Sequence, residues 1–262
     1  MKTKVIAVMN LKGGVGKTVT AINLAADLAH YHRKNVLVVD ADSQANATEF
    51  LGGGREDHSL ATLLRLPTQM RTAFTVTFEA AQAICASTVP NVDLLPADDT
   101  LMDLDLSKAA SGDAWVECLA ELKTNGSLIN YHYVVVDCPP AFNAAAAAAL
   151  LAADEVIIPI KLDAFSLRGL ANLNRQIQNM HKINQDLRVA GLLPVMWYNS
   201  DENKKALAML RESRLLVFPR IRRSNLVDAM TYCQKPLYIS SPKSAACHDY
   251  KTVARIIAEG WY

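Results

Sequence analysis

The stretch VIAVMNLKGGVGKT at residues 5–18 decides the fold. Its first part, Val5–Met9, is an apolar run that predicts a buried strand, and residues Lys17–Tyr31 after it have the pattern of a helix. In such a strand–loop–helix turn the backbone N–H groups of a glycine-rich loop point at one anion, and the helix adds its positive end. The sequence therefore predicts a phosphate-binding loop instead of a plain glycine turn.

Side chains beside the glycines complete the expected site. Lys17 is placed to reach the β- and γ-phosphates of a nucleotide, and the hydroxyl of Thr18 to bind Mg²⁺. Leu11 replaces the first glycine of the usual phosphate-loop pattern, and Lys12 adds a second cation. We expect ATP or ADP with Mg²⁺ as ligands. The expected nucleotide contacts in this loop are Lys12, Gly13, Gly14, Val15, Gly16, Lys17, Thr18 and Val19.

Short apolar runs alternate with helix-length segments along the whole chain. This alternation predicts one α/β domain over residues 1–262, with a mostly parallel twisted sheet flanked by helices. Residues 52–90 are the least regular part and are predicted to be a variable insertion, with a loop at Gly52–Gly54 and short helices near Leu60–Leu66 and Phe78–Cys85. The expected strands are Lys4–Met9, Asn35–Asp40, Val92–Leu95, His132–Asp137, Glu155–Ile160 and Val189–Met196.

Aspartates follow two of these strands at the point where each strand ends. Asp40 and Asp42 come at the end of one strand, and Asp137 ends another just before Pro139-Pro140. Ligands of open parallel sheets bind outside the carboxyl ends of the strands. Asp137 has the form of a Walker B aspartate, which holds Mg²⁺ through water.

Three motifs together resemble the ParA/MinD superfamily of P-loop NTPases, which carry a deviant Walker A loop. They are KGGVGKT at residues 12–18, VLVVDADSQANAT at 36–48 and VVVDCPPAF at 134–142. The resemblance runs from Lys4 to about Glu259, is weakest between Gly52 and Val89, and is greatest to the short, Soj-like ParA partition proteins without an N-terminal DNA-binding extension.

The resemblance implies roles for individual side chains. Lys12 would reach across a nucleotide-sandwich dimer to the phosphates of the partner subunit, and would act in catalysis together with Lys17. Asp42 would position the attacking water, while Asp137, Thr18 and more indirectly Asp40 would act on Mg²⁺.

Other family features are matched less closely. The segment at residues 217–225 resembles the one that closes over the nucleotide base, which implies base contacts from Pro219 and Ile221. The family usually has Pro and Gly where this chain has Ser43 and Ala45, and a hydroxyl residue where it has Val19. The first two departures could alter the flexibility of the segment at residues 36–48, which resembles the first switch segment of the family.

A local excess of basic residues gives the best candidate for a DNA contact, although such clusters are often plain solvated helix faces. It comprises Lys204, Lys205, Arg211, Arg214, Arg220, Arg222 and Arg223. The formal net charge is only +1, so any affinity for DNA must come from such a patch.

The family resemblance favours a DNA-segregation ATPase that hydrolyses ATP slowly with Mg²⁺. Its expected partners are a second copy in the ATP state, non-specific duplex DNA and a ParB-like centromere-binding protein, and its expected location is the cytoplasm, on the nucleoid. The alternatives are a MinD-like membrane-positioning ATPase, which needs a terminal amphipathic anchor that we do not find, and a metabolic ligase or reductase of the same superfamily. The five scattered cysteines lack the spacing of a cluster or metal site, and we interpret Cys138 as a buried packing residue.

Overall fold

The core of the molecule is a sheet of seven strands in the order β3-β4-β2-β5-β1-β6-β7. A computed structural model describes residues 2–53, 58–104, 106–109, 115–212 and 215–262. Neighbouring strands are parallel except for β3 and β4. The strands are β1 (Lys4–Val8), β2 (Val36–Asp40), β3 (Cys85–Ala86), β4 (Val92–Leu95), β5 (Tyr133–Asp137), β6 (Glu155–Lys161) and β7 (Arg188–Val195). The predicted α/β class and mostly parallel sheet are confirmed.

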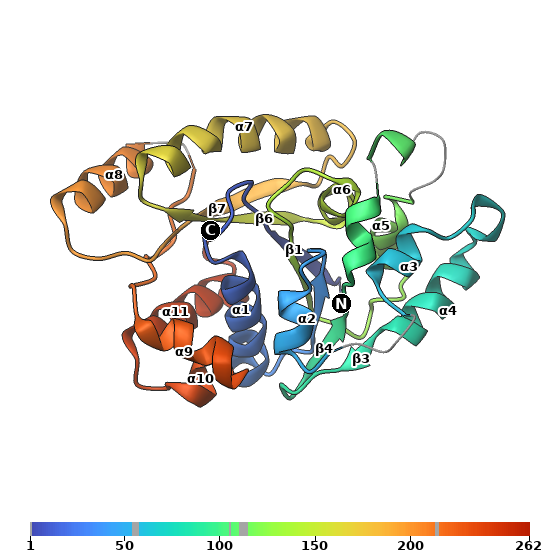
Figure 1. The fold of residues 1–262 in the computed structure, drawn as a ribbon, viewed down its shortest axis with the longest axis horizontal. Coiled ribbons are helices and arrows are strands. Elements are labelled where there is room, and N and C mark those ends of the chain that lie inside the picture. Colours follow the sequence, from blue (N-terminus) through green and yellow to red (C-terminus); the bar gives the residue numbers. More distant parts are fainter. Residues whose placement is uncertain (1, 54–57, 105, 110–114, 213–214) are drawn as a thin grey trace.

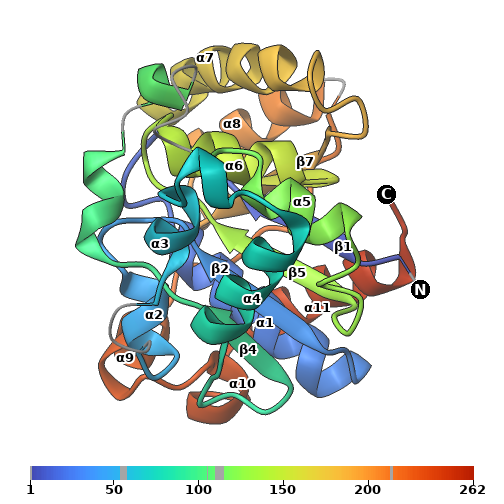
Figure 2. The same cartoon turned by 90° about the vertical axis from the view of Figure 1, so that its right-hand side faces the viewer.

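Helices cover both faces of this sheet (Figures 1 and 2). Helices α3 to α8 bury their apolar side chains against one face, and α1, α2, α9, α10 and α11 bury theirs against the other. The first group is α3 (Leu60–Leu64), α4 (Ala73–Ala83), α5 (Cys118–Thr124), α6 (Ala144–Ala152), α7 (Ala164–His181) and α8 (Asp201–Glu212). The second is α1 (Lys17–His32), α2 (Asn46–Phe50), α9 (Asn225–Cys233), α10 (Leu237–Ser240) and α11 (Ala245–Glu259). None of the described helices is both long and apolar enough to cross a bilayer.

The predicted insertion contains more structure than its sequence indicated. A first short helix, α3, lies where it was predicted, but the second, α4, ends at Ala83, so the prediction of helix up to Cys85 was wrong. Cys85 belongs to β3, the antiparallel strand at the edge of the sheet. Gly52 and Gly53 have positive φ and form the expected turn, while Gly54 lies outside the described residues.

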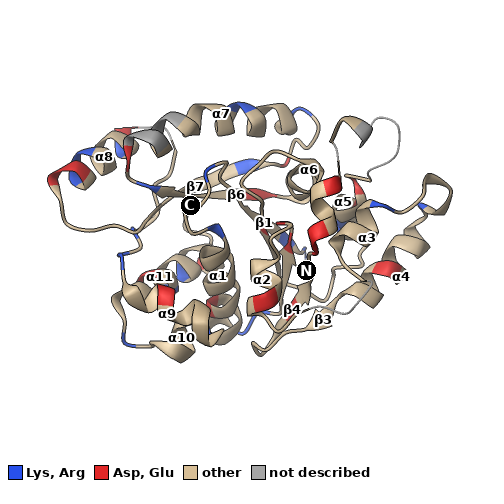
Figure 3. Ribbon diagram, viewed as in Figure 1, with Lys and Arg blue, Asp and Glu red and all other residues tan. Residues whose placement is uncertain are grey.

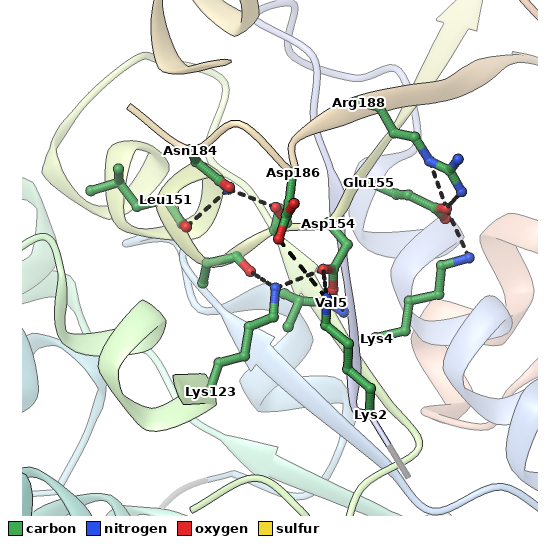
Figure 4. A network of polar contacts seen from close by, with 12 residues as sticks. Lys2, Lys4, Val5, Lys123, Leu151, Asp154, Glu155, Asn184, Asp186 and Arg188 are labelled. Atoms are coloured by element: carbon green, nitrogen blue, oxygen red, sulfur yellow. Dashed lines mark hydrogen bonds and ion pairs between the residues drawn. The ribbon is translucent and has the colours of Figure 1, made fainter. Parts of the chain in front are cut away.

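Charged side chains hold together the end of the sheet where the strands β1, β6 and β7 begin (Figure 4). Glu155 is buried, and its carboxylate accepts hydrogen bonds from Arg188 and from the hydroxyl of Tyr262, with the Lys4 ammonium 2.8 Å away. Asp154 accepts from the Lys123 ammonium at 2.8 Å. These charged side chains are therefore paired with each other where the three strands begin.

The chain that returns from α8 continues along the free edge of β7. Leu192 donates its N–H to the carbonyl of Leu216 at 2.8 Å, and Ile221 donates to the carbonyl of Pro194 at 2.7 Å. Gly191 makes this approach possible, because a Cβ at that position would lie 2.8 Å from the same Leu216 oxygen. These contacts bring residues 217–222 beside the carboxyl end of β7, where ligands of parallel sheets bind.

Candidate nucleotide-binding site

The phosphate loop is an open cradle between β1 and α1. Gly14 and Gly16 have φ angles of 69° and 73°, which only glycine adopts without strain. A Cβ at Gly13, Gly14 or Gly16 would meet no atom within 4 Å, so open space lies beside the loop. The Asn10 side chain fixes the start of the loop, because its amide donates to the Pro159 carbonyl at 2.7 Å and its oxygen accepts from Lys12 N at 3.0 Å. The loop therefore has the shape that a chain of phosphates requires.

Lys17 bends back over this cradle. Its side chain is largely buried, and Nζ donates to the carbonyl of Lys12 at 3.1 Å. Burial lowers the pKa of Lys17, while the carboxylates of Asp137 and Asp42 oppose that shift. A desolvated ammonium is stabilised by a nearby negative charge, so Lys17 is suited to bind a phosphate group at this position.

Lys12 lies at the rim of the loop and contacts residues that the sequence did not single out for the site. Its ammonium donates to both carboxylate oxygens of Asp163 at 2.9 Å and to the hydroxyl of Ser166 at 3.0 Å. Although partial burial acts to raise it, the pKa of Asp163 is lowered to about 2 by hydrogen bonds from Lys12 and Ser166. Asp163 also caps α7 by accepting from the backbone N–H of Ser166. Lys12 is thus held within its own subunit.

Asp40 anchors the segment that follows β2. One carboxylate oxygen accepts from the N–H and the hydroxyl of Thr48 at 2.8 and 2.9 Å, and the other accepts from the N–H of Asp42 at 3.1 Å. Burial raises the pKa of Asp40 to about 6 despite these hydrogen bonds. Thr48 in turn accepts from the N–H of Ala97, so this one aspartate connects the ends of β2 and β4.

Asp137 ends the neighbouring strand β5 and pairs in register with both Asp40 and Val8. It is completely buried. Among the described residues, no donor meets the distance and angle of a hydrogen bond to either of its carboxylate oxygens. Burial and the nearby Asp40 raise its pKa well above the ordinary value, which the hydroxyl of Thr18 and the charge of Lys17 oppose. An unpaired buried carboxylate beside a hydroxyl fits a Mg²⁺ ion.

The described residues alone do not form a closed metal site. Among the residues that the structure describes, no group of three or more His, Cys, Asp or Glu side chains could hold a metal ion. Mg²⁺ ordinarily takes one or two protein ligands and fills the rest of its octahedral shell with water and phosphate oxygens. Thr18 and Asp137 therefore suit an ion that arrives with a nucleotide.

A pocket of about 270 Å³ continues from the start of α1 toward α9. Gly16 and Val19 line its phosphate end, and Ile221 lines it with Val195 at the end of β7. Pro219, the other expected base contact, lines a different hollow. Val19 also lines this pocket, at the position where the family usually has a hydroxyl residue.

The basic residues that follow α7 do not form one uniform patch (Figure 3). Arg211, Arg220 and Arg222 line a hollow of about 490 Å³, where the Arg220 guanidinium stacks on Trp197 at 4.0 Å. Arg222 is paired there with Asp249 at 2.7 Å. Lys204 is paired with Asp201 at 3.3 Å, Lys205 is exposed on α8, and Arg223 lines the 270 Å³ pocket, while Arg214 lies outside the described residues.

Comparisons with known proteins agree with this geometry. Residues 3–189 match a family model described as an AAA domain. The chain is 30% identical to the sporulation initiation inhibitor protein Soj of Bacillus subtilis, over 97% of this chain and 98% of that protein. It is 35% identical to the chromosome partitioning protein ParA of Caulobacter vibrioides, over 74% of this chain and 70% of that one.

Two solved structures are also similar in fold. The apo form of McdA from Cyanothece superposes with a TM-score of 0.79 at 25% identity, over 97% of this chain and 99% of that one. Cobyrinic acid a,c-diamide synthase from Mycobacterium smegmatis, solved with an ATP analogue and magnesium, gives 0.76 at 26% identity, over 99% and 95% of the two chains.

Proposed function

This chain belongs to the ParA/MinD superfamily of ATPases, close to ParA, and from that premise we propose that it is a Mg²⁺-dependent ATPase of DNA segregation. The observation that carries the proposal is the convergence of one open phosphate loop and three aspartates at the carboxyl ends of adjacent strands. ATP hydrolysis by members of this superfamily supports the general activity, and the neighbour with bound ATP analogue and magnesium supports the ligands.

In the proposed reaction, water attacks the γ-phosphorus in line with the leaving oxygen. Asp42 is half-buried two residues beyond its strand, with one oxygen accepting from the N–H of Gln44 and the other available to orient that water. Lys17 and Lys12 stabilise the charge that develops on the phosphates. Thr18 and Asp137, supported by Asp40, would hold Mg²⁺, which would neutralise charge on the phosphates.

We propose that ATP brings two copies together through Lys12. The Lys12 side chain is about one third exposed (37%) and lies at the rim of the loop, so it can turn outward to a phosphate bound by a second subunit. Because the γ-phosphate adds charge that ADP lacks, dimerisation then reports which nucleotide is bound.

The ATP-bound dimer is proposed to bind duplex DNA without sequence preference. Arg220 and Arg211 are the best-placed contacts, because Trp197 fixes the Arg220 guanidinium and no acidic side chain within the described residues pairs with either. Arg222 contributes less, since Asp249 already neutralises it. A ParB-like partner would then stimulate hydrolysis and release the dimer from the nucleoid, in the cytoplasm.

The test is fluorescence anisotropy of a random-sequence duplex over a salt series, with ADP or a slowly hydrolysed ATP analogue. Wild type should bind with the analogue, and Lys12→Ala should not. Arg220→Ala should reduce the slope of log affinity against log salt by about 1 for each subunit in contact. Arg175→Ala removes the same charge from the exposed face of α7 and serves as the control.

The outcomes separate the parts of the proposal. Equal binding of DNA with ADP and with the ATP analogue would contradict the proposed ATP-dependent dimerisation. No binding in either nucleotide, together with normal ATP hydrolysis, would exclude the DNA role and leave the ATPase. The same proteins would then be tested for ATP-dependent binding to liposomes, as expected of a MinD-like positioning protein.

A further inference from the structure

The 270 Å³ pocket has both apolar and charged walls. Its phosphate end is formed by Gly16 and Val19, and its sides include the apolar residues Ile221 and Val227. Basic side chains also line it, from Lys161, Arg222 and Arg223. Helix α9 lies on the same side of the sheet as α1 (Figure 1) and adds Asp228 to the lining. A planar base that enters beyond the phosphates and ribose would therefore lie between aliphatic side chains and meet a carboxylate.

The carboxylate of Asp228 is available as a hydrogen-bond acceptor on this wall. Its carboxylate is exposed, and no hydrogen bond or ion pair joins it to another described residue. The neighbouring hydroxyls are both engaged. Thr231 donates to the backbone carbonyl of Asp228 at 2.7 Å, and Ser224 accepts from the N–H of Leu226 at 3.2 Å as the cap of α9.

The chemistry of purine bases selects what such a carboxylate can bind. Adenine has one exocyclic donor, the amino group on C6, and its ring nitrogens N1, N3 and N7 are acceptors. Guanine carries an oxygen acceptor on C6 in place of this amino group, and its own donors are N1–H and the amino group on C2. On the basis of the nucleotide binding proposed above, we propose that Asp228 accepts a hydrogen bond from the 6-amino group of adenine.

A structural role for Asp228 makes a different prediction. The residue lies in the first turn of α9, where a negative charge stabilises the helix N-terminus. If that were its whole role, its removal would weaken the binding of every nucleotide equally. Discrimination between ligands with and without the amino group distinguishes the two roles.

The experiment is a double-mutant cycle in which one change removes the Asp228 carboxylate and the other removes the 6-amino group of the ligand. Isothermal titration calorimetry with Mg²⁺ would measure ADP and purine riboside 5′-diphosphate, which lacks only the 6-amino group. Wild type should prefer ADP by about tenfold, as expected for a hydrogen bond to a charged group. In Asp228→Ala the preference should fall to within about twofold, while the affinity for purine riboside diphosphate is unchanged. Asp228→Asn keeps an acceptor oxygen without its charge and should be intermediate.

Asp186→Ala is the control, because it removes an exposed carboxylate at the opposite edge of the sheet (Figure 4). A wild type without preference for ADP, or an equal loss of both ligands in Asp228→Ala, would overturn the role of Asp228 while the nucleotide site stands. Binding of neither ligand by wild type would overturn the proposed nucleotide site itself, and this inference with it.

Discussion

The contact between Lys12 and Asp163 predicts that the free subunit restrains its own dimerisation. For Lys12 to reach a second subunit, its ammonium must leave Asp163 and the hydroxyl of Ser166. The substitution Asp163→Asn tests this restraint with little other disturbance. Asparagine caps a helix as well as aspartate does, so the start of α7 is preserved while the charge is removed.

The free energy of the contact between Lys12 and Asp163 can be estimated from the pKa shift of Asp163. The pKa of Asp163 is lowered to about 2, a shift of under two units, which sets a ceiling of about 2.5 kcal/mol. Both side chains are partly exposed, at 37% for Lys12 and 28% for Asp163, so solvent screening reduces the cost of separation to about 1 kcal/mol. Each of the two subunits releases one Lys12, so the gain is about 2 kcal/mol per dimer, and we therefore expect Asp163→Asn to dimerise about thirtyfold more tightly in the ATP analogue.

Sedimentation velocity over a concentration series, with ADP and with the analogue, would measure this change. The gain should shrink at high salt, because an exposed ion pair is screened. Lys12→Ala combined with Asp163→Asn should behave as Lys12→Ala alone, since no lysine is left to release. An unchanged or weaker dimer in Asp163→Asn would refute the restraint, whatever the effect on hydrolysis.

Two further predictions concern stability. Burial raises the pKa of Asp27 to about 7, opposed by Lys251, so the native state binds more protons than the unfolded state between about pH 4 and 7 and loses stability as pH rises. Asp27→Asn should therefore stabilise the protein by about 2 to 4 kcal/mol near pH 8 and hardly at all near pH 4, as measured by urea unfolding; an equal effect at both pH values would contradict this. Ala45 has a φ of 51°, so Ala45→Gly should add about 1 kcal/mol in the same assay, whereas Ala47→Gly, inside α2, should lose a similar amount; a loss in both would show that Ala45 is not strained.

The sequence was sufficient for six of the seven described strands and for the local strand–loop–helix pattern at residues 5–18, because both depend on local patterns. Predicted strand boundaries agree with the observed ones to within one residue, for example at Val92–Leu95. The positive φ of Ala45 also explains why the family prefers glycine there, since only glycine adopts that angle freely. This departure could be noticed from the sequence, but its strain needed the backbone.

The partners of Lys12 could not be predicted, because Asp163 and Ser166 come about 150 residues later and only the pairing of β1 with β6 brings them near. β3 was missed for another reason. A strand of two residues has no periodicity, and its pairing with β4 depends on the fold around it. Pro219 and Ile221 were predicted to share one site, yet they line separate hollows, because their segment passes the end of β7 between the two.

The order of the strands explains why the two aspartate-bearing ends have different chemistry. β5 lies between β1 and β2, so Asp137 is enclosed on both sides and faces the paired ends of its neighbours, Val8 and Asp40. A carboxylate enclosed in this way needs a cation to stay charged. Asp42 lies two residues beyond its strand and is only half-buried, so it can exchange water. The carboxyl ends of these strands therefore place Asp137, which suits a metal ion, next to Asp42, which suits a water molecule. The glycine-rich loop after β1 opens beside both.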